Sequence, residues 1–245
     1  MSKIIKTEAI VLSKINYRDT SIITLVYTEE LGKISAIVKG GRSPKSKIGM
    51  IIDPLNHLQI IIYLKESREV QLLSDAGLIS HFPKLKESLN AIKYSYAVIE
   101  LVNKLIPGGE PNKRIFKGLV RILSLLNSSN RRPEILFGRF FLFLTTEIGY
   151  EIQLVKCSVC GSTDLNNGEI GFNYDRGLLC AKCKKESIDN NKINSELLSY
   201  INCLKNNEQI NSLTETTINN ANNFFESYLQ YHIYNFKEIQ SLKIL

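Results

Sequence analysis

Four of the five cysteines form two C-x2-C pairs. The first pair is Cys157 and Cys160 and the second is Cys180 and Cys183, with nineteen residues between the inner cysteines. Each C-x2-C turn directs two sulfurs at one ion, so two turns can complete a tetrahedron of thiolates. Because four thiolates leave no open coordination position, the spacing predicts one structural Zn²⁺ per chain. Two redox dithiols or unligated cysteines are the alternatives.

A basic loop, residues 39–47, is the second group that could bind a ligand. It contains Lys39, Arg42, Lys45 and Lys47, two glycines and no acid. Lysine and arginine neutralise phosphates, and glycine lets the backbone approach them closely. The composition therefore indicates an oligonucleotide-binding loop, and the alternative is an ordinary solvated loop.

Further residues near predicted strand ends or turns extend this candidate DNA-binding surface. The additional cations are Lys14, Arg18 and Lys33. Tyr17 and Tyr27 are candidate stacking surfaces for bases. Each tyrosine could equally serve in packing.

A second group of cations follows Pro111. Lys113, Lys117 and Arg121 are spaced by four residues, which places them on one stripe of a helix, and Arg132 and Arg139 come later. This group is a candidate site for DNA or for the acidic tail of a partner protein. A solvated helix face is the alternative.

Sequence motifs of catalysis are missing. Gly32-Lys33 lacks the upstream glycine of a P-loop, and the chain has neither H-E-x-x-H nor G-x-S-x-G. The three histidines are isolated from one another in the sequence. We therefore predict no catalytic residue and no enzymatic activity.

The elements that must position these groups begin with β-strands. Short runs rich in Ile, Val, Leu and Thr predict five strands, at residues 9–15, 22–28, 34–39, 58–64 and 70–73. Five short strands within about 70 residues suggest a small sandwich or barrel. The basic loop then falls between the third and fourth strands.

Helical periodicity starts near residue 84. It predicts helices over 85–102, 115–126, 135–148, 197–204 and 218–228, with Cys203 as a small buried residue. The third of these is apolar almost all round, which is typical of a buried helix. The predicted fold is therefore α+β, with a barrel over residues 1–80, a helical domain over 81–245, and a metal module over 155–187 inserted in it.

The charge of the chain is unevenly distributed. The formal net charge is +7, and residues 1–50 hold nine Lys/Arg against four Asp/Glu, while residues 83–156 hold twelve against six. Such local excess can mark a polyanion-binding face. No apolar run approaches the roughly 20 residues that span a bilayer, and no secretory leader is evident. We therefore expect a cytoplasmic protein.

The order of these motifs resembles the bacterial RecO family of recombination mediators and DNA repair proteins. The resemblance covers nearly the whole chain. It is carried by residues 8–12, 19–25, 32–33, 39–42, 45–47, 149–150, both C-x2-C pairs, Phe172 and residues 177–180. Departures from the family pattern occur in residues 41–44, where relatives often have more arginine, and after Pro54, where an aromatic residue is common.

The resemblance implies a function as well as a fold. It implies an OB-fold barrel that binds single- and double-stranded DNA, a helical domain and a zinc-ribbon-like insertion. It also implies annealing of complementary strands and, with RecR, loading of RecA onto DNA coated by single-stranded-DNA-binding protein, whose acidic C-terminal tail docks on the helical domain. The family's basic loop matches Lys39, Arg42, Lys45 and Lys47, and its zinc ligands match the four paired cysteines. Association with the nucleoid follows from these roles.

Two other functions remain open at this point. One is a zinc-containing protein-interaction adapter that does not bind nucleic acid. The other is a nuclease or another metal-dependent enzyme.

Overall fold

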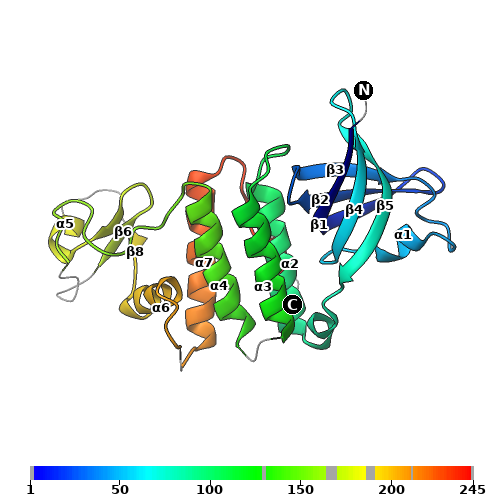
Figure 1. Ribbon diagram of the computed structural model, residues 1–245. Coiled ribbons are helices and arrows are strands. Elements are labelled where there is room, and N and C mark those ends of the chain that lie inside the picture. The colour runs from blue at the N-terminus through cyan, green and yellow to red at the C-terminus, as the bar shows by residue number, and fades with distance from the viewer. Residues whose placement is uncertain (1–2, 129–130, 164–169, 186–190, 211, 244–245) are drawn as a thin grey trace. The chain divides into compact units, whose positions relative to one another are not determined.

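The computed structural model describes residues 3–128, 131–163, 170–185, 191–210 and 212–243. The chain forms two compact units (Figure 1). Residues 1–133 and 239–245 belong to the first unit, and residues 134–238 belong to the second. The chain therefore leaves the first unit and later returns to it.

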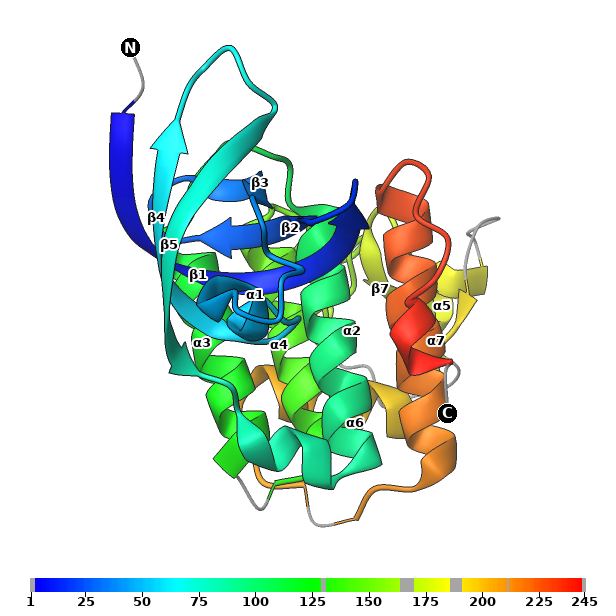
Figure 2. The same cartoon turned by 90° about the vertical axis from the view of Figure 1, so that its right-hand side faces the viewer.

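A closed five-stranded barrel begins the first unit (Figure 2). Its strands are β1 (Lys3–Tyr17), β2 (Ser21–Thr28), β3 (Gly32–Val38), β4 (His57–Leu64) and β5 (Val70–Ser80). They follow one another in the order β1-β2-β3-β5-β4, and β4 pairs with β1 to close the barrel. All pairs are antiparallel except β3 with β5. The predicted OB-fold barrel and α+β class are confirmed.

Alternation of apolar side chains explains the barrel. In β2, Ile22 and Val26 point into the core, and Ala36 and Val38 of β3 meet them there. Strand β1 starts six residues before the predicted strand. Its first residues do not show the polar–apolar alternation of a half-buried strand, because Lys3 and Ile4 are both exposed. It must be long because it pairs with β4 over residues 3–10 and with β2 over residues 9–17.

Helix α1 (Lys47–Ile51) lies between β3 and β4 in sequence. Ser46 caps its first turn by accepting a hydrogen bond from the Gly49 N–H. Ile48 and Ile51 pack against the barrel core. This contact holds the end of the basic loop on the barrel.

Two helices complete the first unit, with a short 3-10 turn, η1 (Pro83–Glu87), leading into them. They are α2 (Leu89–Leu105) and α3 (Lys113–Ser128), and both were predicted, although residues 85–87 belong to η1. Tyr27 of β2 joins barrel and helices, because its hydroxyl donates to the Asn112 carbonyl at 3.4 Å and its ring lies 6.4 Å from Phe116.

The C-terminal segment also belongs to the first unit. Ile239 is fully buried, and a 3-10 turn, η2 (Gln240–Leu242), follows it. The Glu100 carboxylate of α2 accepts hydrogen bonds from the backbone N–H groups of Gln240 and Ser241, both at 2.8 Å, and from the Ser241 hydroxyl at 2.6 Å. This one side chain therefore fastens residues 240–241 to α2.

The second unit is built on three helices, α4 (Pro133–Glu147), α6 (Ser195–Lys205) and α7 (Glu215–His232). Helix α4 is buried along most of its length, as predicted. Phe141 of α4 stacks on Phe225 of α7 with ring centroids 4.1 Å apart. A Cβ at Gly138 would lie 2.6 Å from a Leu204 methyl, so the glycine permits the close approach of α4 and α6.

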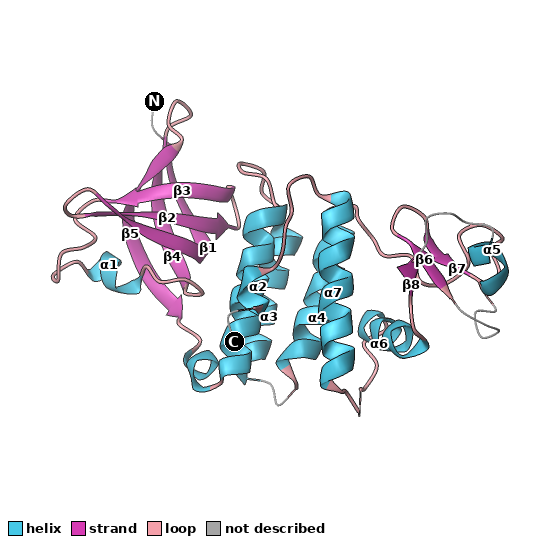
Figure 3. Ribbon diagram, turned by 180° about the vertical axis from the view of Figure 1, so that it is seen from behind, coloured by secondary structure: helices cyan, strands magenta, loops and turns pink. Residues whose placement is uncertain are grey.

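A small module interrupts these helices (Figure 3). Strands β6 (Gly171–Asn173), β7 (Gly177–Leu179) and β8 (Asn191–Lys192) form its sheet, and helix α5 (Ala181–Lys185) follows β7. Strands β6 and β7 form an antiparallel hairpin that leads into the second cysteine pair. Phe172 joins the module to α7, because its ring lies 5.0 Å from that of Phe224 in edge-to-face geometry.

Cys203 differs from its predicted role. It is half-buried on α6 rather than buried, and its thiol donates to the Glu208 carboxylate at 3.4 Å. Leu204, the next residue along α6, is buried, but adjacent residues of a helix point in different directions. Cys203 therefore does not share the buried face of Leu204. Among the described residues, no helix is both long and apolar enough to cross a membrane.

Candidate metal centre and nucleic-acid interface

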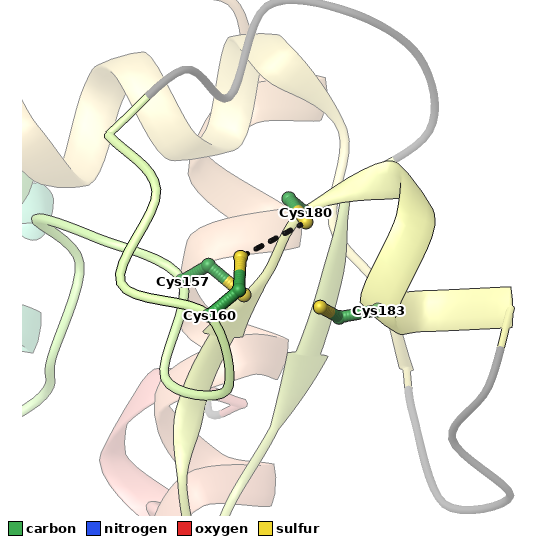
Figure 4. A group of neighbouring side chains, drawn as sticks. All are labelled: Cys157, Cys160, Cys180 and Cys183. Carbon is green, nitrogen blue, oxygen red and sulfur yellow. Dashed lines mark hydrogen bonds between the residues drawn. The ribbon is translucent and has the colours of Figure 1, made fainter.

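The two C-x2-C pairs face each other in the small module. The sulfurs of Cys157, Cys160, Cys180 and Cys183 all lie within 4.8 Å of one another (Figure 4). Cys157 and Cys160 come from a loop, Cys180 lies just before α5, and Cys183 lies on that helix. The four cysteines are therefore close enough to hold one metal ion.

The spacing of the sulfurs fits tetrahedral thiolate coordination. The Sγ atoms of Cys160 and Cys180 lie 3.7 Å apart. Sulfurs at the corners of a tetrahedron around Zn²⁺, each about 2.3 Å from the ion, would be about 3.8 Å apart. The set consists only of soft thiol donors, which favours zinc over hard cations such as Mg²⁺ and Ca²⁺.

Backbone hydrogen bonds hold the two pairs together. The Ser158 N–H donates to the Leu178 carbonyl at 2.8 Å, which joins the first pair to β7. Gly161 follows Cys160 with a φ of +75°, and its N–H donates to the Cys157 carbonyl at 2.9 Å. This left-handed residue closes the turn and suits glycine.

The pKa values of the thiols of Cys157 and Cys183 differ, because their surroundings in the cluster differ. Burial raises the pKa of the Cys157 thiol, but hydrogen bonds from the backbone at Cys160, Cys180 and Val159 outweigh burial and bring it to about 6. Burial and hydrogen bonds to the other three sulfurs raise the pKa of Cys183 to about 12. Without a metal ion, these pKa values favour a thiolate at Cys157. The positive charge of a bound metal ion would stabilise the other three cysteines as thiolates as well.

The basic loop is fastened to the turn between β1 and β2. Arg42 donates from Nη1 to the carbonyls of Arg18 and Asp19 at 2.9 and 3.1 Å, and its backbone N–H donates to Thr20 at 2.8 Å. Loop and turn are separated by more than twenty residues in sequence. Arg42 therefore brings Arg18 into the same surface as the loop cations.

The β1–β2 turn presents an arginine and an aromatic ring together. The Arg18 guanidinium carbon lies 5.2 Å from the centre of the Tyr17 ring, and both side chains are exposed. A guanidinium over an aromatic face is a favourable cation–π arrangement. The pair offers a charge for a phosphate and a flat surface for a base.

The loop itself has a defined shape. A Cβ at Gly49 would lie 1.8 Å from the Gly41 carbonyl oxygen, so the loop folds back onto the start of α1 with room only for glycine. Ser43 and Ser46 N–H groups donate to Gly40 and Ser43 carbonyls. Lys39, Arg42, Lys45 and Lys47 are exposed on this ordered loop.

Two predicted DNA-binding cations make other contacts. The Lys14 ammonium pairs with the Asp53 carboxylate at 2.5 Å. Lys33 donates to the Asn103 carbonyl of α2 at 2.5 Å, and burial lowers the pKa of its ammonium group. Lys33 lies near the start of β3, at the end opposite Lys39, so the structure does not bring it to the basic loop.

Of the two readings left open for Tyr27, a stacking surface for bases or a packing residue, the structure supports packing. Its side chain is fully buried against α3, and burial raises the pKa of its hydroxyl. Its place in the β2 sequence cannot reveal this, because the covering helix comes from residues 113–128.

Comparison with known proteins agrees with this architecture. A profile of the family described as "Recombination protein O N terminal" matches residues 1–82, and one described as "Recombination protein O C terminal" matches residues 86–239. The chain belongs to the RecO family of DNA repair proteins. The boundary between the two profiles falls close to the end of β5 and the beginning of η1.

Individual members of the RecO family are similar over different lengths. The DNA repair protein RecO of Chlorobium phaeobacteroides is 31% identical, and the alignment covers 94% of each chain. That of Chlorobium limicola is 37% identical over 64% of this chain and 60% of its own length. That of Caldicellulosiruptor bescii is 30% identical over 76% of this chain and 74% of its own.

The helical cations of this RecO-family chain are divided between the two units and differ in their contacts. Lys113 pairs with Glu30 at 2.6 Å, and this hydrogen bond and charge raise the pKa of Lys113. Lys117 and Arg121 are exposed on α3, and Arg132 is exposed beyond it. Arg139 belongs to the second unit, where it donates to the Glu208 carbonyl at 2.7 Å.

Sequence reasoning missed several residues that shape these sites. Asp53 neutralises Lys14, and the carbonyls of Arg18 and Asp19 hold Arg42. These partners carry no sequence signal, since carbonyls are present at every residue and Asp53 is 39 residues from Lys14.

Proposed function

We propose that the protein is a DNA repair and homologous recombination mediator that binds single- and double-stranded DNA and anneals complementary strands. Phosphates would bind the basic loop and the β1–β2 turn, and screening of their charge would let two strands approach. The predicted contacts are Lys39, Arg42, Lys45, Lys47 and Arg18. Lys14 and Lys33 stay in the predicted set, although each already has a partner.

One observation supports DNA binding most directly. Arg42 joins two segments that are distant in sequence, so that exposed cations of loop and turn share one surface. Such an arrangement concentrates positive potential beside the exposed Tyr17 ring. Membership of the RecO family agrees with this role.

We also propose the partners of the reaction. Together with RecR, the protein would help load RecA onto DNA coated by single-stranded-DNA-binding protein. The acidic tail of that coating protein would bind the helical cations, and the candidates are Lys113, Lys117, Arg121, Arg132 and Arg139. Lys117 and Arg121 support this best, because they are exposed and pair with no acid in the described part of the chain.

Zinc would serve structure in this function. Cys157, Cys160, Cys180 and Cys183 would hold one Zn²⁺, which would supply cross-linking of the two cysteine pairs and no open position for a reactant. The protein would act without catalysing a reaction, in the cytoplasm at the nucleoid. A barrel of residues 1–80 and a helical domain of 81–245 with the module 155–187 remain our proposed domains.

Titration of fluorescent oligonucleotides at several salt concentrations tests DNA binding. Four to six phosphate contacts predict a log–log slope of about −3 to −4 for single strands. Alanine at Lys39, Lys45 and Lys47 should weaken binding and flatten the slope. A flat slope in the unaltered protein would instead favour an adapter that does not bind nucleic acid.

Strand annealing tests the mediator role. Complementary strands coated with single-stranded-DNA-binding protein should anneal faster with this protein, and less so when the acidic tail of the coating protein is deleted. Incubation of labelled DNA with the protein and Mg²⁺ should leave the DNA intact. Cleavage that depends on the protein would contradict the non-enzymatic role.

A further inference from the structure

The four clustered cysteines differ in their exposure to solvent. Cys157 and Cys183 are 1% and 6% exposed, and they pack with Leu179 in the buried cluster of the small module. Cys160 is exposed, and Cys180 is half-buried. Each C-x2-C pair therefore supplies one buried cysteine and one cysteine that a small solute can reach.

The two accessible cysteines come from different pairs and lie side by side. Their Sγ atoms are 3.7 Å apart, as the dashed line in Figure 4 marks. A disulfide bond is about 2.05 Å long, so the two sulfurs need to approach by less than about 2 Å. Cys160 lies in a turn, and Cys180 lies between β7 and α5, so this approach does not require a helix or a strand to break.

We infer that Cys160 and Cys180 form a site of reversible oxidation by hydrogen peroxide. The inference rests on the proposed zinc site and adds a means of regulating it. Oxidation joins the two cysteines in a disulfide, and the zinc ion is released because only two of its four ligands remain. Reduction of the disulfide by a thiol restores all four ligands.

Two electrons pass from the sulfurs to the peroxide in this reaction. The Cys160 thiolate attacks one peroxide oxygen, the O–O bond breaks, and a sulfenic acid and a hydroxide ion form. The Cys180 thiolate then attacks the Cys160 sulfur, the S–O bond breaks, and a second hydroxide ion leaves. Two thiolates and one hydrogen peroxide thus yield one disulfide and two hydroxide ions.

Packing favours Cys180 over Cys157 as the partner of Cys160. Cys157 belongs to the buried cluster, and its carbonyl accepts a hydrogen bond from the Gly161 N–H at 2.9 Å. A disulfide within the first pair would draw the Cys157 sulfur out of this cluster. A disulfide between Cys160 and Cys180 leaves the cluster packed.

The disulfide replaces the metal ion as the link between the two cysteine pairs. Its two cysteines are 20 residues apart, and closing a loop of this length restricts the unfolded chain. Oxidised protein should therefore melt at a higher temperature than reduced protein from which a chelator has removed the zinc. The link should also keep Phe172 of β6 packed on Phe224 of α7.

Hydrogen peroxide treatment of the Cys203→Ser protein tests the inference, because this change removes the fifth cysteine. A chromogenic chelator follows the release of zinc. One disulfide, between Cys160 and Cys180, should form for each zinc ion released. Dithiothreitol followed by added zinc should reverse both changes.

Mass spectrometry after tryptic digestion identifies the linked cysteines. Arg176 and Lys182 lie on either side of Cys180, so trypsin separates Cys180 from Cys183. Fragmentation of the peptide that carries the first pair then shows whether Cys160 is the linked residue. The thermal melt of the oxidised protein is compared with that of the reduced, chelator-treated protein.

Cys160→His provides a matched variant. Three cysteines and one histidine are an established set of zinc ligands, so the variant should hold one equivalent of zinc without the most exposed thiol. It should lose this zinc to hydrogen peroxide at least about fivefold more slowly than the Cys203→Ser protein. If the histidine variant does not hold zinc, the disulfide mapped in the Cys203→Ser protein decides the result.

Three outcomes would overturn the inference. These are a disulfide between Cys157 and Cys160, zinc release without any disulfide, and an oxidised protein that melts no higher than the chelator-treated one. Absence of zinc before oxidation would instead contradict the proposed metal site. A disulfide between Cys160 and Cys180 formed in that zinc-free protein would still support the oxidation site.

Discussion

At the scale of single residues, Arg42 holds the basic loop, residues 39–47, against the turn between β1 and β2. Its guanidinium binds two carbonyls of the β1–β2 turn, while the lysines of the loop make no comparable contact among the described residues. Arginine is suited to this because its planar fork reaches two acceptors at once, which a lysine ammonium cannot do in the same geometry. Arg42 therefore has a positioning role besides its charge.

Arg42→Lys should separate the two roles. The charge is retained, but the turn that carries Arg18 and Tyr17 loses its anchor, so affinity for single strands should fall several-fold and the free energy of unfolding by about 1 kcal/mol. The matched change Lys45→Arg should alter neither. Fluorescence anisotropy and thermal melting measure these effects. Equal affinities of the two variants would show that Arg42 contributes charge alone.

His57 makes the stability of the first unit sensitive to pH. It is buried beside Phe116, and its Nε2 lies 2.9 Å from the Glu8 carboxylate. Burial lowers the pKa of His57, and the nearby carboxylate raises it by less. As pH falls below about 6.5, the unfolded chain takes up this proton first, so the folded state loses stability.

His57→Gln tests this dependence. The fall in melting temperature between about pH 7.5 and pH 5.5 should be smaller in the variant than in the unaltered protein. His81→Gln, a change at an exposed histidine, should leave the fall unchanged. An identical fall in all three proteins would assign the pH dependence to other groups.

At the scale of elements, local patterns predicted most of the fold. All five strands and the principal helices follow from periodicity, and the cysteine spacing predicted which four residues converge. The patterns could not reveal that Tyr27 is covered by α3 or that Lys33 reaches Asn103, because both contacts join elements about 70 or more residues apart. Burial of polar residues by distant elements leaves no periodic signal.

We expect the cysteine module to depend on the proposed zinc ion, because the described part of the module has a small buried cluster of its own. Its buried cluster comprises Cys157, Leu179 and Cys183, with Cys180 packed against it. Phe172 then transmits the position of the sheet to Phe224 of α7. Loss of the ion should therefore loosen both the module and its packing on the helix.

Cys160→Ser should abolish binding of one equivalent of zinc. It should also lower the melting temperature of the protein by more than about 5 °C, because metal binding and local folding are coupled. Cys203→Ser is the control, since Cys203 contacts Glu208 and lies outside the cluster. Metal analysis after purification without chelator, followed by thermal melting, decides the result. Full zinc content in the Cys160 variant would contradict the assignment.

At the scale of the whole molecule, the second unit is inserted into the first. The chain crosses between them after residue 133 and again after residue 238. Hydrogen bonds to Glu100 and the burial of Ile239 hold the returning segment on α2. Burial lowers the acidity of the Glu100 carboxyl, but its bonds to Lys104, Ser241 and Gln240 outweigh this and lower its pKa.

Ending the chain at Glu238 should therefore weaken the first unit alone. Loss of the Ile239 burial and of the Glu100 hydrogen bonds should reduce its free energy of unfolding by about 2 kcal/mol or more. The zinc content should equal that of the unaltered protein, because the four cysteines belong to the second unit. Glu100→Gln should give a smaller loss in the same direction. A melting curve unchanged by the truncation would show that the segment is not needed by the first unit.

The returning segment also has a consequence for synthesis on the ribosome. Residues 134–238 are made before residues 239–243, so the inserted unit can fold while the barrel-bearing unit still lacks the segment that covers α2. Until that segment emerges, the apolar site of Ile239 on the nascent chain stays open to chaperones. A ribosome that stalls late would thus release a chain with a folded cysteine module and an unfinished barrel-bearing unit.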